Sequence, residues 1–394
     1  MTSTIGARLD QATRELPAPL AVVDLDGVDA NATDLVRRAS GTPIRVASKS
    51  VRVRAVLQRV LARDGFAGVM AYSLREALWL VSQGVDDVLM GYPTVDTGAL
   101  EKLAADPAAS AAVTLMVDDV AQVDLAARAA EGRGVTLRLC LDVDASLKFR
   151  IGPLAAHLGV RRSPVHSPDD ARALAAAIAA RPGVDVVGVM FYEAQVAGLP
   201  DSSRAIRAVK RLSIADLATR RGAVVAAVQE AAGHPLSIVN SGGSGSVASS
   251  AADPAVTEVT AGSGLFVPTL FDDYRSFTPR PAAFFGLDVV RIPGAGFATA
   301  FGGGYIASGP ATKSRQPRPA WPDGLSLTNR EGAGEVQTPL RLSGGADLRV
   351  GDRVWFRHAK AGEVMERFDS VHLVRGTAIE ATVPTYRGES QNFG

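Results

Sequence analysis

Residues 20–64 read LAVVDLDGVDANATDLVRRASGTPIRVASKSVRVRAVLQRVLARD, and the fold class is best read from this segment. A short β-branched run, Leu20–Leu25, precedes a longer run with helical spacing, Val28–Ala39. The same order returns with Ile44–Ser48 and then Val51–Asp64. Short strands that alternate with longer helices are typical of βα units, so we expect an α/β fold.

This alternation continues and gives about eight βα repeats over roughly 250 residues, which predicts a TIM-like (β/α)8 barrel. A doubly wound open sheet is the alternative. It is disfavoured because no G-x-G-x-x-G sequence follows the first strand. The further expected strands are Gly68–Ala71, Val88–Met90, Ala112–Val117, Val135–Val143, Val184–Met190, Leu236–Asn240 and Val256–Val259, and the further expected helices are Leu74–Gln83, Val120–Glu131, Ser167–Arg181 and Ser202–Ala232.

The pattern changes near Pro281, where Gly and Pro become dense and helical spacing nearly vanishes. We therefore expect a barrel domain over residues 1–280 and an all-β domain over residues 281–394. The stretch Ser308–Asp323 is rich in Pro and Arg and is expected to be an ordered loop. The strands expected in the β domain are Ala283–Ile292, Gln337–Leu342, Arg353–Arg357, Ser370–Val374 and Ile379–Pro384.

The composition excludes several classes of protein. The 394 residues are 47% hydrophobic and 21% charged, which is enough for a large packed core. The 42 basic and 41 acidic residues leave no electrostatic signature for nucleic acid or an acidic membrane. The single cysteine, Cys140, is expected to be a buried strand thiol. No apolar run approaches the roughly 18 residues of a membrane helix, and the N-terminus lacks the apolar core of a secretory signal, so we expect a soluble cytoplasmic protein.

Lys49 is the first candidate for chemistry. It stands at the carboxyl end of an early strand, in Arg45-Val46-Ala47-Ser48-Lys49-Ser50. In a TIM barrel that end of the strands faces the active site. A lysine there can form an imine with an aldehyde cofactor if neighbouring charge and burial lower its pKa. The alternative is a solvent-facing or salt-bridged lysine.

Two glycine-rich loops follow late strands, Asn240–Ser246 and Ala261–Gly264. Small residues let backbone N–H groups approach a phosphate, and serine hydroxyls add donors. TIM barrels often place a phosphate site on late-strand loops, although two flexible turns are the alternative. The residues expected to bind the phosphate of a cofactor are Ser241, Gly242, Gly243, Ser244, Gly262, Ser263 and Gly264.

Polar residues follow two other strands. Arg150 lies just past the strand that carries Asp142 and Asp144, where an arginine can donate to a cofactor oxygen or a carboxylate. Tyr192 and Glu193 follow the strand Val184–Met190, and this Tyr-Glu-x-Gln segment is unusually polar for a strand end. A surface arginine and an ordinary polar loop are the alternatives.

His358 and Lys360 follow the apolar Val354-Trp355-Phe356, and strand alternation would place both on one face. Two charged and buried groups at this spacing would repel each other. The pair is therefore expected to be exposed or to serve an anionic ligand. His157, His166 and His234 are expected at loops or helix ends, and His372 at a strand surface.

Taken together, these segments resemble the pyridoxal 5′-phosphate (PLP)-dependent enzymes of the alanine-racemase-like fold (fold type III). Within that family they are most similar to the D-threonine aldolase and D-serine dehydratase branch, also labelled amino acid deaminase/aldolase. The resemblance begins at Pro17–Asp24 and covers nearly the whole chain; Phe301–Ser308 and Gly334–Gln337 resemble landmarks of the family's β domain. It implies that Lys49 carries PLP and that Arg150 and Gly152 form the family's R-x-G at the cofactor's phenolic oxygen. It also implies that Tyr192 lies beside the cofactor.

One departure concerns a metal. The resembled branch usually holds a divalent metal with His-x-Cys or His-x-Asp in its β domain, whereas this chain has His358-Ala359-Lys360. An ammonium is not a ligand for zinc or manganese, so we expect no metal. Lys360 would instead occupy the metal's place and stabilise the substrate's 3-oxygen or protonate a leaving hydroxyl.

The resemblance implies a PLP-dependent lyase acting on D-configured β-hydroxy amino acids. In an aldolase, His358 would take the β-hydroxyl proton, and the products would be glycine and an aldehyde. In a dehydratase, Lys49 would remove the α-proton, and the products would be a 2-oxo acid and ammonia. A racemase or decarboxylase and a non-catalytic PLP-holding protein are the other readings. The family also implies a homodimer, in which His358 and Lys360 may serve the partner's site.

Overall fold

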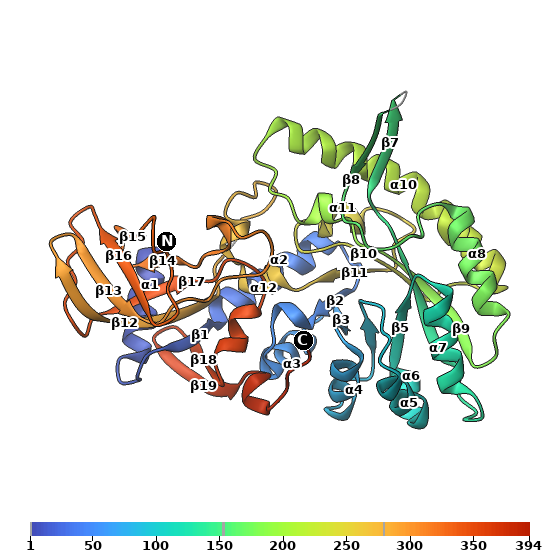
Figure 1. The fold of residues 1–394 in the computed structure, drawn as a ribbon, viewed down its shortest axis with the longest axis horizontal. Helices are drawn as coiled ribbons and strands as arrows, with labels where there is room; N and C mark the ends of the chain where they lie inside the picture. Colours follow the sequence, from blue (N-terminus) through green and yellow to red (C-terminus); the bar gives the residue numbers. More distant parts are fainter. Residues whose placement is uncertain (1, 152–153, 279) are drawn as a thin grey trace. The chain divides into compact units, whose positions relative to one another are not determined.

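The computed structural model describes residues 2–151, 154–278 and 280–394 (Figure 1). The chain divides into two compact units. The barrel unit comprises Leu35–Ser48, Val60–Ala261 and Phe393–Gly394, and the sheet unit comprises Met1–Asp34, Lys49–Arg59 and Gly262–Asn392. A closed parallel barrel and a separate, mostly antiparallel sheet confirm the expected fold class. The expected domain limits, 1–280 and 281–394, stay a prediction.

The barrel unit is built around eight parallel strands that close on themselves in the order β10-β11-β2-β3-β4-β5-β6-β9. The pairing of β9 with β10 completes the ring, and the pairing of β11 with β2 joins the last strand to the first. Because all strands run in one direction, their carboxyl ends form one rim. The strands are β2 (Ile44–Ala47), β3 (Phe66–Ala71), β4 (Val88–Met90), β5 (Val113–Val117), β6 (Leu137–Val143), β9 (Val184–Phe191), β10 (Ile238–Ser241) and β11 (Glu258–Ala261).

Helices separate the strands, and their ends follow from local sequence. Ser167 begins α8 with a capping box to Asp170, and Pro168 occupies the first turn, where no N–H is needed. Gly233, with φ of +77°, ends α10 in the left-handed conformation that glycine favours. The helices are α2 (Leu25–Ala39), α3 (Arg54–Leu61), α4 (Leu74–Ser82), α5 (Thr97–Ala105), α6 (Pro107–Ala112), α7 (Val120–Ala130), α8 (Pro168–Ala179), α9 (Ala194–Ala197), α10 (Arg204–Ala232) and α11 (Val247–Ala251).

The barrel interior contains an apolar layer. Its buried members come from five strands and contact one another: Leu89, Met116, Cys140, Met190 and Ile238. Side chains two residues apart in a strand point to the same face, so the residue two positions further along each strand also points into the barrel, one layer closer to the rim. This rule identifies the inward-facing residues at the rim.

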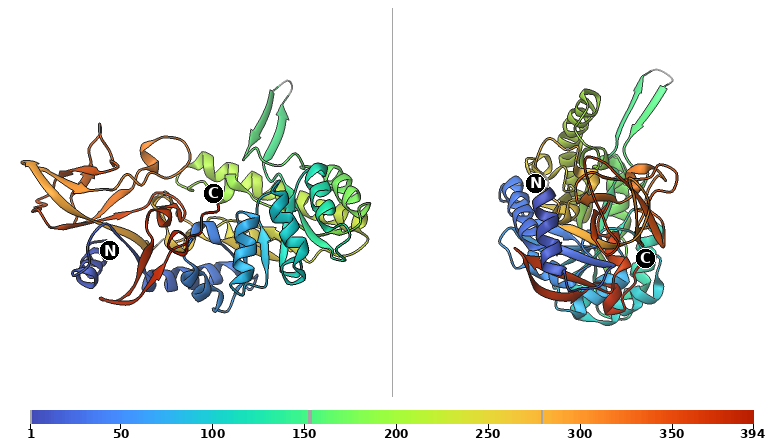
Figure 2. Two further views of the ribbon diagram at one scale, coloured as in Figure 1. Left: turned by 60° about the horizontal axis from the view of Figure 1, so that its bottom comes forward. Right: turned by 90° about the vertical axis from the view of Figure 1, so that its left-hand side faces the viewer.

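A two-stranded hairpin interrupts the βα pattern between β6 and α8. It pairs β7 (Leu147–Ile151) with β8 (Leu154–Leu158) and forms no part of the barrel sheet. The hairpin projects away from the barrel strands in each view (Figure 2). Neither strand was expected from the sequence.

The sheet unit contains nine strands, with the path β15-β16-β13-β12-β1-β18-β19 and β17 pairing with both β12 and β14. All five strands expected in the C-terminal part are present. Ser308–Asp323, expected to be a loop, includes the short strand β14. The strands are β1 (Leu20–Asp24), β12 (Ala283–Gly294), β13 (Phe297–Phe301), β14 (Arg318–Trp321), β15 (Leu325–Leu327), β16 (Gln337–Leu342), β17 (Arg353–Arg357), β18 (Ser370–Arg375) and β19 (Ala378–Pro384).

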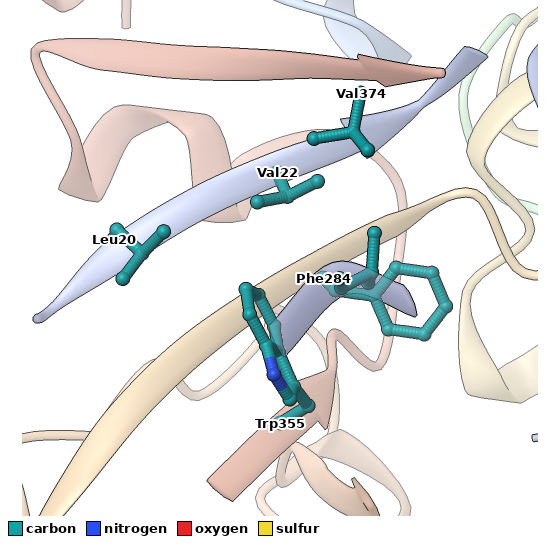
Figure 3. Close-up of a cluster of buried hydrophobic side chains, with 6 residues drawn as sticks. Leu20, Val22, Phe284, Trp355 and Val374 are labelled. Carbon is teal, nitrogen blue, oxygen red and sulfur yellow. The ribbon is translucent and has the colours of Figure 1, made fainter. Parts of the chain in front are cut away.

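β1 belongs to this sheet and not to the barrel. It pairs antiparallel with β12 and parallel with β18, and all five of its residues are buried. Its side chains contribute to a core with Leu9 of α1 (Thr2–Thr13), Phe284, Trp355 and Val374 (Figure 3). The barrel therefore begins at β2, and its eight strands are the remaining ones that the sequence predicts.

Short helical turns complete the structure: η1 (Ser48–Ser50), α12 (Ser263–Phe266), η2 (Thr269–Phe271), η3 (Lys313–Arg315), η4 (Glu363–Arg367) and η5 (Arg387–Glu389). Within the described ranges, every helix is too short or too polar to cross a membrane.

Candidate active site

Lys49 lies in η1, the turn that immediately follows barrel strand β2. The preceding residue, Ser48, is fully buried and donates its hydroxyl to the Met70 carbonyl of β3 at 3.0 Å. On the other side, the Lys49 carbonyl accepts a hydrogen bond from the Arg52 side chain at 3.2 Å. The backbone around Lys49 is therefore held on both sides, at the strand end where the sequence analysis expects the cofactor lysine.

The sheet unit brings the segment after β17 next to the Lys49 turn. A Cβ atom added to Gly362 would lie 2.6 Å from the backbone carbonyl carbon of Ser50, so only a glycine permits this approach. An ion pair of 2.7 Å between Arg52 and Glu366 strengthens the contact. Two of the predicted catalytic segments, around Lys49 and around His358–Lys360, are thus neighbours in the fold.

His358 is buried, with 3% of its surface exposed. β17 ends at Arg357, so the alternation expected to place His358 and Lys360 on one face stops before it reaches them. Neither ring nitrogen makes a hydrogen bond of good geometry with a described residue, although backbone groups of Ala283 and Ala361 lie near enough to the ring to raise its pKa slightly. Burial, and then the neighbouring Arg357 guanidinium, lower the pKa of His358 to about 3. The imidazole is therefore neutral at physiological pH, so it does not repel the positive charge of Lys360.

Lys360 is half-buried and belongs to a small polar cluster with Ser308 and Glu363. Its ammonium donates to the Ser308 hydroxyl at 2.9 Å. The Ser308 N–H donates to the Glu363 carboxylate at 2.8 Å, and the Ser308 hydroxyl donates to the same carboxylate. Ser308 is therefore hydrogen-bonded to one positive and one negative side chain.

The first glycine-rich loop follows β10 and needs glycine at two positions. Gly242 has a φ of +94°, a backbone conformation that would be strained in a residue with a side chain. A Cβ atom on Gly243 would lie 2.8 Å from the Ala197 Cβ and 3.4 Å from the Tyr192 ring. The guanidinium of Arg38, from α2, also donates to the Ser244 carbonyl at 2.8 Å. The loop is therefore tightly packed and requires small residues, and its assignment as a phosphate site stays a prediction.

Glu193 is a buried carboxylate that holds this loop from behind. One of its oxygens accepts the Ser241 hydroxyl at 3.0 Å and the Gly242 N–H at 3.2 Å. The other accepts the Ser246 hydroxyl at 3.0 Å and also the Ser250 hydroxyl. Four donors on one carboxylate satisfy a buried charge that would otherwise be costly. The Ser241 and Gly242 donors therefore point at Glu193.

Arg221 supports the same loop from α10. It pairs with Asp253, donates to the Ser241 hydroxyl at 2.9 Å, and lies 5.2 Å from the centre of the Phe191 ring. All three polar groups are buried. The chain Asp253–Arg221–Ser241–Glu193 is thus continuous from the outer helix to the loop.

The second glycine-rich loop forms the start of α12. Gly262 precedes this single turn, and Ser263 and Gly264 are its first residues, immediately after barrel strand β11. Gly262 and Gly264 are buried, whereas Ser263 is half-buried. The buried Asn31 amide donates to the Leu265 carbonyl at 2.9 Å and ties this turn to α2.

Tyr192, immediately after β9, packs against the apolar layer inside the barrel. Burial raises the pKa of its phenol. The Arg162 guanidinium lies 5.2 Å from the centre of the Tyr192 ring and 5.8 Å from that of Tyr92. A guanidinium over aromatic faces is attracted by the rings, and these contacts place Arg162 beside Tyr192.

Asp142 is the least expected group at the rim. It lies two residues after Cys140 in β6 and so points into the barrel. Its surface is 8% exposed, and the hydrogen bond it makes with a described residue is at its backbone carbonyl, which accepts the Ser163 hydroxyl, and not at its carboxyl group. Burial, and then the neighbouring Asp118 charge, raise the pKa of Asp142 to about 7, while Arg162 acts in the opposite direction.

The remaining predicted residues lie as follows. Arg150 is in β7 of the projecting hairpin, paired in register with Ala155, and Gly152 lies outside the described residues. Cys140 is fully buried, and burial raises the pKa of its thiol, so the expectation of an inert strand thiol is confirmed. Gln195 is buried and donates to the Ala145 carbonyl at 2.7 Å.

Three residues were not singled out from the sequence as members of the site: Asp142, Arg162 and Asp118. Asp142 and Asp118 each stand two positions after an apolar residue that faces the barrel interior, and this spacing is the signal that could have identified them. Arg162 follows the hairpin, so no strand pattern places it. Across residues 2–151, 154–278 and 280–394, no three His, Cys, Asp or Glu side chains are grouped as a metal site would require.

Comparisons with known proteins identify a family and a shared fold. A model of the alanine racemase N-terminal domain matches residues 23–269. Among curated proteins, a 3-hydroxy-D-aspartate aldolase of Paracoccus denitrificans (strain Pd 1222) is 26% identical over 237 residues, which cover 59% of this chain and 56% of the relative. The chain therefore spans little more than half the length of this curated relative.

Two solved structures share the fold over nearly the whole chain. D-threonine aldolase from Filomicrobium marinum has a TM-score of 0.79 and 21% identity, with 95% of this chain and 96% of that chain covered. D-threo-3-hydroxyaspartate dehydratase from Delftia sp. HT23 has a TM-score of 0.73 and 20% identity, with 94% and 97% covered. At these identities the likeness demonstrates a shared fold.

The two perturbed residues should affect the pH dependence of stability with opposite signs. Below pH 6.5 the unfolded chain protonates His358 while the folded protein excludes that proton, so stability is lost as the pH falls from 6.5 towards 3. In the folded protein Asp142 keeps a proton that the unfolded chain releases above pH 3.8. The protonated carboxyl therefore stabilises the fold fully below pH 3.8, and this stabilisation is lost as the pH rises through about 7. Each slope is at most about 1.4 kcal/mol per pH unit.

The measurement is the free energy of unfolding in urea between pH 4 and 8 for the wild type, His358→Leu and Asp142→Asn. Relative to the wild type, His358→Leu should gain stability as the pH falls, and Asp142→Asn should gain stability as the pH rises. Curves that run parallel to the wild type would show that neither pKa is shifted as described.

Proposed function

Since the chain belongs to the alanine racemase N-terminal domain family, the PLP-dependent family with fold type III, we propose that it is a lyase acting on D-configured β-hydroxy amino acids. The match over residues 23–269 confirms the family that the sequence resembles. The proposed reaction is retro-aldol cleavage to glycine and an aldehyde, as in D-threonine aldolase. The observation that supports it most directly is the pair of neighbouring segments around Lys49 and His358–Lys360.

The residues fit PLP at three points. Lys49, at the end of β2, offers the amine, and the tight loop after β10 offers small residues that let backbone approach a phosphate. We propose that the two glycine-rich loops hold the phosphate, around Gly243 and Ser244 and at Gly262–Gly264, whereas in this structure the Ser241 hydroxyl and the Gly242 N–H donate to Glu193. When bound, PLP would supply an electron-accepting ring.

The side chains of this protein would orient the substrate and move protons. Tyr192 presents a phenol at the rim, and the sequence resemblance assigns Arg150 to the cofactor's phenolic oxygen. Lys360 would place a positive charge near the substrate's 3-oxygen, where negative charge develops. His358 was expected to take the β-hydroxyl proton, but an imidazole with a pKa of about 3 is a weak base.

Two other functions are less well supported. A D-serine dehydratase-like deamination needs the β-hydroxyl to leave, and hydroxide is a poor leaving group without a strong acid. A two-base racemase would need a tyrosine from the β domain near the cofactor. Tyr305 packs against Phe285 and Phe368, and Tyr386 is fully buried. A barrel that only holds PLP would not need the sheet unit.

The proposed lyase does not depend on a tightly bound metal. Of the residues where related enzymes bind one, His358 is a potential ligand, whereas Lys360 carries an ammonium that repels cations. Glu363, the nearest carboxylate in sequence that could replace a ligand, accepts two hydrogen bonds from Ser308. This arrangement supports a site in which Lys360 provides the positive charge.

The cofactor assignment can be tested by reduction. Protein loaded with PLP should absorb visible light, and borohydride should fix the label on Lys49, because the amine at the end of β2 is the predicted attachment point. Peptide mass mapping identifies the labelled lysine. Lys49→Ala should lose the label, whereas Lys360→Ala should keep it. Labelling of any other lysine in the wild type contradicts the assignment.

A homodimer is also expected, from the resembled family, together with a cytoplasmic location. Sedimentation velocity at micromolar concentration should give about twice the 41.0 kDa of the chain. A monomer with full activity would contradict this expectation.

The reaction can be tested with a panel of D- and L-β-hydroxy amino acids, assayed for glycine, aldehyde, 2-oxo acid and ammonia. We expect glycine and aldehyde from D-configured substrates, because the site is proposed to break the Cα–Cβ bond. Production of 2-oxo acid and ammonia instead would favour the dehydratase.

The same assay addresses the metal. Prolonged chelation should leave turnover unchanged, whereas Lys360→Ala should lower kcat about 10²-fold or more with little change in PLP occupancy. Loss of activity on chelation, with recovery on adding manganese or zinc, would show that other residues hold a metal.

A further inference from the structure

The rim of the barrel contains an acid–base group that the sequence resemblance does not assign. Cys140 contacts Leu89, Met116, Met190 and Ile238 in the apolar layer and therefore faces the barrel interior. Asp142 stands two positions later in β6 and pairs in register with Met190 of β9. Its side chain consequently points into the barrel, one layer closer to the carboxyl ends of the strands.

The surroundings of Asp142 are unusual for a carboxyl group. It is more than nine-tenths buried, and its side-chain oxygens accept no hydrogen bond from any described residue, although its backbone carbonyl accepts the Ser163 hydroxyl at 2.6 Å. Buried polar groups in proteins nearly always have partners, and an unpaired one indicates strain, function or an absent ligand. Asp142 faces the barrel interior near the carboxyl ends of the strands and accepts no side-chain hydrogen bond from a described residue, which makes it a candidate for contact with a ligand.

The charges that face Asp142 come from several elements. Asp118, after β5, and Asp144, the residue that follows β6, disfavour ionisation, whereas Arg162 favours it. Arg162 also lies over the ring of Tyr192, the phenol that follows β9. Burial together with these opposing charges raises the pKa of Asp142 to about 7. Near neutral pH, a carboxyl with that pKa can both accept and return a proton.

We propose that Asp142 accepts the β-hydroxyl proton of the substrate during retro-aldol cleavage, an inference that rests on the proposed lyase function. β2, which precedes Lys49, and β6, which carries Asp142, end at the same rim because the barrel strands are parallel. The O–H bond breaks, and its electron pair becomes the second C–O bond of the aldehyde. The Cα–Cβ bond breaks, its pair stays with Cα, and Cα then takes a proton to give glycine. No oxidant or reductant is needed.

The first test is the pH dependence of kcat/KM for holoenzyme with D-threonine and with 3-hydroxy-D-aspartate. The base must be ionised, so activity of the wild type should fall as the pH drops below about 7. Asp142→Asn should be roughly 10²- to 10⁴-fold slower and should lack that acid limb, while its PLP absorbance stays unchanged. Asp142→Glu should retain part of the activity with a displaced limb.

A matched control is Asp185→Asn. Asp185 is in β9, near the amino end of the barrel, and pairs with His234 on a partly exposed surface. Its replacement should leave both the rate and the pH profile intact. A second measurement uses Asp142→Ala, in which added formate should restore activity in proportion to its concentration, because formate can replace the missing carboxylate.

The outcomes separate the two proposals. If the wild type cleaves neither substrate, the proposed function fails, and this inference fails with it. If the wild type is active and Asp142→Asn keeps its rate and its acid limb, the inference alone is overturned. Should Asp142→Asn fail to fold, Asp142→Glu decides: a displaced acid limb supports the proposal, and an unchanged limb overturns it.

Discussion

The arrangement of the barrel depends on one buried arginine at its closure. Arg45 of β2 is 2% exposed and donates two hydrogen bonds of 2.7 Å to Glu258 of β11, the strand that closes the ring. It also donates to both carboxylate oxygens of Asp87, at 3.0 and 2.9 Å. Loss of one partner from a buried pair leaves an uncompensated charge and costs roughly 3–5 kcal/mol. β2, whose end carries the Lys49 turn, is therefore fixed between its neighbours.

The barrel interior is consequently layered. Arg45 and Glu258 pair near the amino ends of the strands, and the Asn240 amide donates to Glu258 at 2.7 Å. Met116, Cys140 and Met190 belong to the apolar layer, and Asp142 stands two positions beyond Cys140 in β6, in register with Met190. Glu258 has the Arg45 guanidinium at hydrogen-bonding distance, whereas the Asp142 carboxyl accepts no hydrogen bond from the residues that the structure describes.

The sequence predicted the barrel and the second sheet because strand and helix periodicities are local properties. β1 was assigned to the barrel because five buried residues, LAVVD, look the same in either sheet. The hairpin of β7 and β8 was missed although Gly152-Pro153 is a turn signal, because Leu147–Leu158 contains a single β-branched residue, Ile151, and so lacks a strong strand signal. The candidate lysine and glycine loops could be located from strand ends. The roles of Glu193 and Asp142 could not be located in this way. Glu193 accepts hydrogen bonds from serines about fifty residues away in the sequence. A sequence pattern does not show that the Asp142 carboxyl lacks a hydrogen-bond donor among the described residues. Burial favours the neutral form of both His358 and Asp142. It does so by lowering the pKa of the histidine and by raising the pKa of the aspartate.

The carboxylate of Glu193 has a thermodynamic consequence for ligand capture. A flexible glycine loop loses conformational entropy when it closes around a phosphate, and that loss weakens binding. Here the Ser241, Gly242, Ser246 and Ser250 donors converge on one carboxylate within the fold itself. The conformational entropy of the loop is therefore lost when the protein folds, and not when a ligand binds. A phosphate-bearing ligand would meet a surface whose shape is set in advance, and its affinity would reflect new contacts with little penalty for arranging them.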